Sequence, residues 1–152
     1  MLIHTVNFGD LEVPDDKIIT FKEGLPGFPQ IRRFVVLELD DIKPFQYLQS
    51  LDDPPITFFI INPFMVDPTY EFRLSESDMS DVNSKNSTEL AVYAVATIPE
   101  NPNDSTINLM APIVINELGR CGKQVILHES KYSVKHPLLQ IDAQEEAKAQ
   151  EA

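Results

Sequence analysis

The chain has 152 residues, which is enough for one domain with a real hydrophobic core. Its 24 acidic residues outnumber the 12 lysines and arginines, and the formal net charge of −12 argues against direct binding of nucleic acid, because phosphate backbones would be repelled. The single cysteine, the lack of a secretory signal pattern and the lack of an apolar run long enough to span a bilayer predict a cytoplasmic protein with no membrane segment.

The N-terminal part of the chain predicts a β-hairpin, a short strand and a tight turn. Residues 2–13 alternate apolar and polar side chains around Gly9-Asp10, a pair that suits a tight hairpin turn. Residues 17–21 form the next β-prone run. In Leu25-Pro26-Gly27-Phe28 the proline and the glycine occupy the positions that a type II turn requires, with a positive φ at the glycine. The alternating residues before the hairpin turn are Leu2, Val6 and Phe8.

Two nearly continuous apolar runs, 34–39 and 56–61, predict buried strands. The segment 44–51 between them is different, because its apolar residues fall at helical spacing and the acidic and proline-rich residues that follow stop a long helix. We therefore expect a single turn or an irregular loop there. The residues at helical spacing are Phe45, Leu48 and Leu51.

The next segment predicts a loop, a strand and a helix. Residues 64–67 lie between two prolines and predict a loop with apolar side chains. The apolar side chains of residues 70–74 alternate with charged ones, which predicts a strand. Ser75-Glu76-Ser77-Asp78 has capping-box spacing, with Asp in place of the usual Glu, and predicts one short helix that ends near Val82.

The most regular β-patterns lie in the C-terminal half. Residues 90–98 alternate throughout, and the alternation of residues 107–115 places five apolar residues on one face, with an irregularity expected at Pro112 because it cannot donate to a ladder. A loop with Gly119 and Gly122 and a second apolar run follow, so 106–128 is predicted as a β-hairpin that pairs antiparallel with 90–98. The five residues are Ile107, Leu109, Ala111, Ile113 and Ile115.

These patterns predict an all-β fold with eight to ten strands, as a sandwich or barrel, and one short helix. We place one domain at residues 1–140, with a last short segment at 132–139 lying across it. Residues 141–152 have few apolar side chains to anchor them and are predicted to be a flexible, polar, acidic tail.

No residue pattern indicates catalysis, a cofactor or a metal. The three histidines, His4, His128 and His136, are far apart and none is near a nucleophile motif. Cys121 has basic neighbours that could lower a thiol pKa, but no second cysteine exists to resolve an oxidised thiol. Glycine patterns that cradle phosphate are missing, and the paired aspartates lack the alternating ligand spacing of a calcium loop.

A surface for a protein partner is a better candidate. Phe64, Met65 and Val66 are followed by concentrated negative charge, the composition of an apolar anchor with an electrostatic rim. The open alternative is that these three side chains cap one end of the barrel. The acidic residues are Asp67, Glu71, Glu76, Asp78 and Asp81.

Four stretches in order resemble the FliW family of flagellar assembly factors, and the resemblance runs to about Leu139. They are Ile19-Thr20-Phe21 through Gly24-Leu25-Pro26-Gly27-Phe28; Pro44-Phe45 with Leu48-Gln49-Ser50; residues 59–63 with Tyr70-Glu71-Phe72; and residues 108–116, Asn-Leu-Met-Ala-Pro-Ile-Val-Ile-Asn. The resemblance implies a single-domain, antiparallel β-barrel-like protein of the bacterial cytoplasm. It also implies a non-enzymatic regulator that binds the translational repressor CsrA, relieves repression of flagellin mRNA, and is switched off when it binds flagellin.

The contact residues are hypotheses from side-chain chemistry, because the family's contacts are not tied to a sharp motif. Apolar side chains would supply affinity for CsrA, and acidic side chains would fix its position on the surface. The helical ends of flagellin would need an apolar groove. For CsrA we predict Met65, Val66, Asp67, Glu71, Asp78 and Asp81; for flagellin we predict Phe28, Phe45 and Tyr47.

Two other classes of function remain as alternatives. A small-ligand-binding β-barrel or an uncharacterised enzyme would require polar side chains that converge in a cavity. A single-strand binder on an oligonucleotide-binding barrel would require aromatic residues interleaved with lysine and arginine, but Phe34, Phe58 and Phe59 lie among aliphatic residues.

Overall fold

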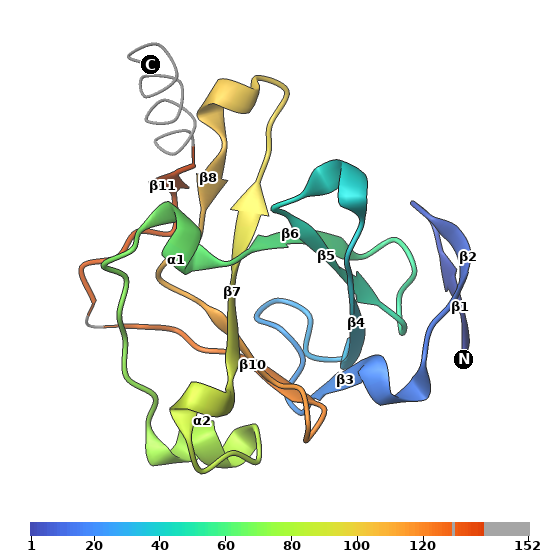
Figure 1. Ribbon diagram of the computed structural model, residues 1–152, viewed down its shortest axis with the longest axis horizontal. Coiled ribbons are helices and arrows are strands. Elements are labelled where there is room, and N and C mark those ends of the chain that lie inside the picture. The colour runs from blue at the N-terminus through green and yellow to red at the C-terminus, as the bar shows by residue number, and fades with distance from the viewer. Residues whose placement is uncertain (129, 139–152) are drawn as a thin grey trace.

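The computed structural model describes residues 1–128 and 130–138, and within them the chain forms eleven strands and two short α-helices (Figure 1). The strands are β1 (Leu2–Thr5), β2 (Gly9–Glu12), β3 (Ile18–Phe21), β4 (Arg33–Leu37), β5 (Gln46–Ser50), β6 (Thr57–Ile61), β7 (Ala91–Thr97), β8 (Thr106–Ile107), β9 (Ile113–Asn116), β10 (Cys121–Gln124) and β11 (His136–Pro137). The helices are α1 (Pro63–Val66) and α2 (Glu76–Asp81), and four single-turn 3₁₀ segments lie in the connections between these elements. None of the described helices is long and apolar enough to cross a membrane.

Seven strands close into a barrel in the order β7-β6-β5-β4-β3-β10-β9, because β9 pairs again with β7. The all-β barrel that we predicted is therefore confirmed. Six of the seven neighbouring pairs are antiparallel, but β10 pairs with β3 in parallel, with Cys121 opposite Thr20 and Gly122 opposite Phe21. The barrel is thus mainly antiparallel, as expected, and its one parallel pair joins two strands that are far apart in sequence and are not connected by a hairpin.

The barrel interior is filled by apolar side chains. Phe21 and Phe34 are fully buried and meet edge to face, with ring centroids 5.1 Å apart. Leu25 is buried in the same cluster. It begins the turn that follows β3, which is closed by backbone hydrogen bonds between Leu25 and Phe28 and has Gly27 at φ 85°. This is the turn predicted from the sequence. The other buried members of the cluster are Ile19, Leu48, Ile60, Ile113 and Ile115.

The N-terminal hairpin, β1 with β2, is a separate two-stranded sheet that packs on the outside of the barrel. Ile3 and Val13 are buried against Val35 of β4. The hairpin was predicted correctly, but the prediction of which side chains face the core was wrong. Leu2 and Val6 are exposed, and Ile3 lies on the buried face. The turn comes before Gly9, which begins β2 with a positive φ, so the strand register differs from the expected one.

Residues 44–51, which we expected to be a turn or an irregular loop, contain strand β5. β4 and β6 pair with it on both sides, so its backbone groups are satisfied in the sheet, and Leu48 is buried in the barrel interior. The helical spacing of Phe45, Leu48 and Leu51 was misleading because tertiary pairing outweighs a short periodic pattern.

The described structure has two short helices, whereas the sequence predicted one. α2 begins with the predicted capping box, in which the backbone N–H of Asp78 donates to Ser75 Oγ (3.0 Å) and the backbone N–H of Ser75 donates to the Asp78 carboxylate (3.3 Å). α1 occupies the segment predicted as a loop. Its single turn is stabilised by Pro63 at its start and by the side chain of Asn62, which accepts a hydrogen bond from the backbone N–H of Phe64 (2.9 Å).

Residues 70–74 are not a strand, although their exposure alternates as predicted. They belong to a connector, residues 67–75, that runs from α1 to α2 along the outside of the molecule (Figure 1). The alternating pattern is correct for an extended chain, but no neighbouring strand is available to pair with it.

The segment 106–116 is interrupted at the expected place. β8 and β9 are separated by residues 108–112, where the Asn108 side chain accepts hydrogen bonds from the backbone N–H groups of Met110 (3.1 Å) and Ala111 (3.0 Å). β9 forms the predicted hairpin with β10, and β7 pairs antiparallel with both β8 and β9. The second strand is Cys121–Gln124 rather than the following apolar run. The predicted tail, 141–152, lies outside the described residues.

Gly122 allows the close approach that closes the barrel. A Cβ atom added at Gly122 would lie 2.6 Å from Cζ of Phe21 and 3.1 Å from Cγ2 of Ile19, both of which are buried. We expect Gly122→Ala to lower the free energy of unfolding by about 1–3 kcal/mol, as overpacking of a core does. Urea unfolding checks this. The double variant Gly122→Ala with Phe21→Leu should lose less stability than the sum of the losses of the two single variants, because the smaller leucine makes room for the added methyl group. Strictly additive losses would contradict the proposed contact.

Candidate functional site

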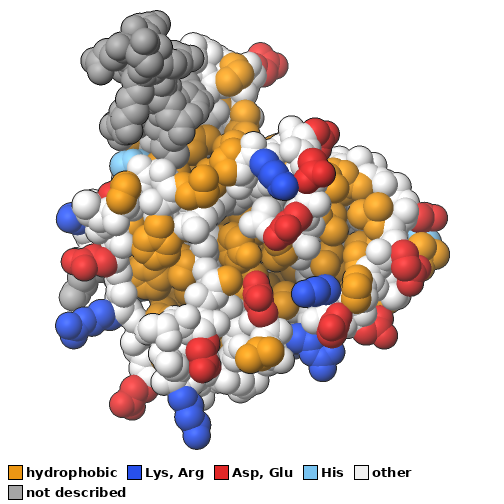
Figure 2. Space-filling view, in the orientation of Figure 1, with side chains coloured by type: hydrophobic (Ala, Val, Ile, Leu, Met, Phe, Trp, Pro, Cys, Tyr) orange, Lys and Arg blue, Asp and Glu red, His pale blue; other side chains and the backbone are white. Residues whose placement is uncertain are grey.

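An apolar groove lies between the connector and β7. We call it the connector groove, and Figure 2 shows hydrophobic side chains gathered on this face of the molecule. Its volume is about 580 Å³ and it is open to solvent rather than enclosed by the barrel. The charged residues that line it are Glu71, Arg73 and Lys85. The apolar lining residues are Phe64, Tyr70, Phe72, Leu74, Met79, Leu90, Val92 and Val114.

The floor of the groove is held by Tyr70. This side chain is buried, and its hydroxyl donates to the backbone carbonyl of Leu109 (2.7 Å). Burial, with a smaller contribution from Tyr132, raises the pKa of Tyr70 far above its ordinary value, so the phenol stays protonated and keeps donating. The rings of Phe64, Phe72 and Tyr132 pack around it, with centroids 5.7, 5.4 and 4.6 Å from the Tyr70 ring. The groove therefore rests on a rigid aromatic cluster.

α1 presents apolar side chains to solvent at one end of the groove. Phe64 is 41% exposed and Met65 is 51% exposed, whereas Val66 packs against the core beneath β7. The alternative that all three cap the barrel applies only to Val66. Phe64 lines the groove, and the exposed Met65 next to it in α1 enlarges the apolar area that a protein partner could cover.

Asp67 and Glu71 place negative charge beside these anchors. The Asp67 carboxylate accepts hydrogen bonds from Thr69 Oγ1 (2.6 Å) and from the Thr69 backbone N–H (3.0 Å). These bonds outweigh partial burial and lower the pKa of Asp67 below its usual value, so the carboxylate is ionised at neutral pH. Glu71 is exposed on the connector, and its backbone N–H donates to the Tyr132 hydroxyl (2.9 Å).

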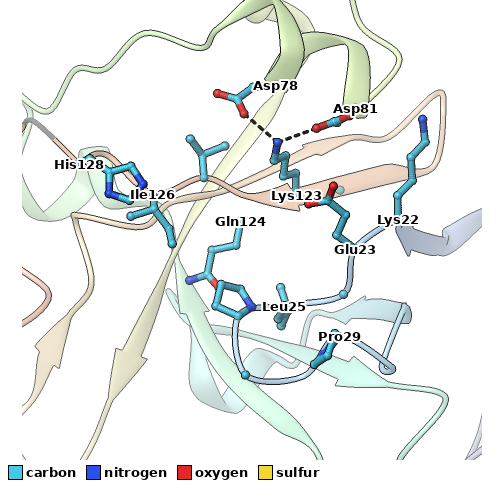
Figure 3. A pocket seen from close by; sticks show the side chains of 15 residues that line it. Lys22, Glu23, Leu25, Pro29, Asp78, Asp81, Lys123, Gln124, Ile126 and His128 are labelled. Carbon is cyan, nitrogen blue, oxygen red and sulfur yellow. Dashed lines mark hydrogen bonds and ion pairs between the residues drawn. The ribbon is translucent and has the colours of Figure 1, made fainter.

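Asp78 and Asp81 lie elsewhere. Figure 1 shows α1 and α2 at opposite ends of β7, and Figure 3 shows Lys123 reaching from β10 to both carboxylates of α2. Lys123 Nζ lies 2.9 Å from Asp78 Oδ1 and 2.6 Å from Asp81 Oδ2. The structure therefore does not bring the six residues predicted for CsrA onto one surface, because two of them are compensated by a lysine and tie α2 to the barrel.

This ion-pair cluster borders a second depression, between α2, β10 and the turn after β3 (Figure 3). Although burial opposes ionisation of Asp78, hydrogen bonds from Lys123 and Ser75 lower the pKa of this carboxyl below its usual value. Burial likewise opposes the charged form of Lys123, but Asp78 and Asp81 raise the pKa of the ammonium above its ordinary value. All three groups are half-buried, so the cluster is stronger than an exposed ion pair and serves attachment of α2.

The three residues predicted for flagellin are also divided. Phe45 and Tyr47 both pack on Phe59, with ring centroids 6.1 and 4.8 Å away, on the outer face of β6. Phe28 packs on Phe58, whose side chain points to the opposite face of the same strand. Tyr47 also meets Phe8 (4.7 Å), so the outer group is a separate aromatic surface.

The histidines and the cysteine do not converge. Among residues 1–128 and 130–138, no three His, Cys, Asp or Glu side chains are placed to hold a metal ion. Cys121 is buried, where its thiol accepts a hydrogen bond from Asn83 Nδ2 (3.2 Å) and donates to the carbonyl of Gly119 (3.4 Å). These contacts indicate that Cys121 has a structural role, in the packing of β10 near β9 and α2.

Sequence reasoning missed most of the connector groove. Leu90 and Val92 were read only as part of a strand, and Tyr70, Phe72 and Leu74 were taken for the face of another strand. The signal was present in the alternation of residues 70–74. What the sequence did not show was that this alternating segment faces β7 across an open groove.

Comparisons with known proteins agree on one family. The family model described as "FliW protein" matches residues 2–138. The chain is 40% identical over 143 residues to "Flagellar assembly factor FliW" of Thermosipho africanus, covering 93% of this chain and 99% of that protein. It is 38% identical over 138 residues to the protein of the same name from Bacillus subtilis, covering 91% and 96%. A solved structure, "Crystal structure of the flagellar assembly factor FliW", superposes with a TM-score of 0.85 at 39% identity, covering 91% of this chain and 96% of that one.

Replacing Lys123 tests the attachment of α2. We expect Lys123→Met to lower the free energy of unfolding at pH 7 by about 1–2 kcal/mol, because two neighbouring carboxylates lose their counter-ion. The pKa of Asp78 is lowered by folding, so its stabilising contribution is complete above the unfolded pKa and is lost as the pH falls through the folded pKa. The difference between the variant and the parent should therefore shrink when urea unfolding is repeated at about pH 2.5.

The matched control is Lys135→Met, since Lys135 is exposed and the described residues place no carboxylate within ion-pair distance of it. A loss in Lys123→Met that is equally large at both pH values would contradict the ionic origin.

Proposed function

Because the chain belongs to the FliW family, we propose that it is a flagellar assembly factor that acts by binding other proteins rather than by catalysis. The observation that carries this proposal is the connector groove with the exposed Phe64 and Met65 of α1 at its end. Apolar side chains gathered beside ionised carboxylates have the composition of a protein-binding surface.

The filled barrel favours this function over a small-ligand carrier. A carrier of that kind needs a cavity inside the barrel with a few convergent polar groups. Here Phe21, Phe34 and Leu48 are fully buried in the interior together with aliphatic side chains. The connector groove lies on the outside, where a protein can reach it.

We propose the translational repressor CsrA as the partner of the α1 end of the connector groove, with Met65, Val66, Asp67 and Glu71 in or next to the contact. The net charge of −12 would weaken the attraction of a bound repressor for RNA phosphates. Asp78 and Asp81 also belonged to the predicted contact. Their role in the proposal is indirect, since they hold α2 and thus one end of the connector.

Flagellin is the second proposed partner. Its helical ends would pack on the outer aromatic surface of Phe8, Phe45, Tyr47 and Phe59, where ring faces offer apolar area without a backbone template. Bound flagellin would lower the affinity of the protein for the repressor, so that unsecreted flagellin frees CsrA to repress flagellin mRNA. We place this exchange in the bacterial cytoplasm.

The first test is a titration of the protein into CsrA bound to a labelled flagellin leader RNA, with and without flagellin, at two salt concentrations. We expect RNA release that flagellin reverses. Phe64→Ala and Met65→Ala should each weaken release by about tenfold, the loss of one apolar anchor. Leu118→Ala is the matched control, because Leu118 is 93% exposed at the tip of the β9–β10 hairpin, away from α1. If all three variants release RNA as the parent does, the proposed surface is wrong.

The divided aromatic residues give a second test. Tyr47→Ala should weaken flagellin binding, measured by calorimetry, by about tenfold, because it opens the stack between Phe8 and Phe59. Phe28→Ala removes an exposed ring that packs on Phe58, on the opposite face of β6, and should weaken binding less than twofold. Equal losses would show that flagellin contacts the turn after β3 as well.

A further inference from the structure

The connector carries main-chain hydrogen-bonding groups that nothing in the described structure uses. Within residues 1–128 and 130–138, the backbone N–H groups of Phe72, Arg73 and Leu74 have no hydrogen-bond partner. The exposure of the segment alternates, with Phe72 and Leu74 half-buried and Glu71 and Arg73 exposed, which is the pattern of an extended chain. An extended chain with unpaired N–H and C=O groups is a template for another strand.

The two edges of this segment differ. In an extended chain the N–H and C=O groups of alternate residues point to opposite edges. The N–H of Glu71 is taken by the Tyr132 hydroxyl, so the edge shared by Glu71 and Arg73 faces the segment around Tyr132. The N–H and C=O groups of Phe72 and Leu74 point to the other edge. That edge can offer two donors and two acceptors to one incoming strand.

The sheet of the barrel does not fill this edge. β7, which forms the opposite wall of the connector groove, pairs with β6 through Ala94–Ala96 on one side and with β8 and β9 on the other, and none of its described pairings involves the connector. The groove between remains open and is lined by apolar side chains, among them Leu90, Val92 and Met79. Side chains that alternate along an added strand could enter it, and Met79 could adapt to their shape.

The charge along the groove indicates the composition of that strand. Arg73 and Lys85 line the groove and Glu71 is the single carboxylate among its lining residues, so the groove is net positive in a chain with a formal charge of −12. Neither cation has an ion-pair partner among the described residues. A carboxylate on the incoming segment would complement them.

We propose that the connector binds an extended segment of CsrA by β-strand addition, with Phe72 and Leu74 supplying the main-chain hydrogen bonds. The segment carries apolar side chains at alternate positions and an acidic residue that meets Arg73 and Lys85. Main-chain pairing gives affinity and the groove selects the side chains. This inference rests on the proposed function, because it assigns a binding mode to the surface already proposed for that partner.

Amide hydrogen exchange, measured by NMR on the full chain with and without purified CsrA, tests the binding mode. We expect exchange at Phe72 and Leu74 to slow by about tenfold or more in the complex, because both amides enter a ladder. Exchange at Arg73 should change by less than about twofold, since its N–H points to the other edge. A complex that slows all three amides alike, or none of them, overturns strand addition while leaving the proposed function intact. If no complex forms, the proposed function fails together with the inference.

Charge-reversal variants test the composition of the segment. Arg73→Glu and Lys85→Glu should each weaken the complex with CsrA by about fivefold to tenfold at low salt, with a smaller effect at high salt. The control is Lys135→Glu, which makes the same charge change at an exposed site outside the groove. Equal effects of all three substitutions would show that only net charge matters, and would overturn the acidic contact.

Discussion

The contact between Gly122 and the Phe21 ring is the constraint on which the rest of the structure depends. β3 and β10 are far apart in the chain, and their short pairing is what turns an open sheet into a barrel. Only a residue without a Cβ lets the backbone of β10 come this close to a fully buried aromatic ring. The ring in turn packs against Phe34 in the barrel interior, with ring centroids 5.1 Å apart. One glycine therefore allows the barrel to close around its aromatic core.

Closure also explains why the binding surface is where it is. In the closed ring, β7 pairs with β6 through Ala94–Ala96 and with β8 and β9 on its other side, and the connector takes no part in these pairings. The connector, although its sequence is suited to a strand, is left to cross the outside of the barrel with its side chains facing β7 over a groove. Its two ends are fixed, by the Asn62 cap and Tyr70 at α1 and by the Lys123 ion pairs at α2. The unpaired segment is thus held in an extended shape without being covered.

Much of the fold could be predicted from local patterns, because alternation in residues 90–98, the capping box at Ser75 and the turn at Gly27 are specified by neighbours in sequence. Features set by distant contacts could not. The pairing of β5 with β4 and β6 made a strand of residues with helical spacing, and residues 70–74 pair with no strand although their side chains alternate. For the site, sequence composition correctly indicated exposed apolar residues in α1. It could not show that Asp78 and Asp81 face Lys123, which lies 42 residues beyond Asp81 in the chain, because ion pairing depends on how α2 sits on β10.

The parallel pair in the barrel follows from arithmetic as well as from chain connectivity. Around a closed ring, strand direction must return to its starting sense after one circuit, so directions can alternate at every step only if the number of strands is even. Seven strands make full alternation impossible, and at least one neighbouring pair must run the same way. The structure has one such mismatch and places it between β3 and β10. A variant of this ring with one strand more or one strand fewer would therefore need an even number of parallel pairs instead of an odd number. Two strands inserted together as a hairpin would leave the single parallel pair in place.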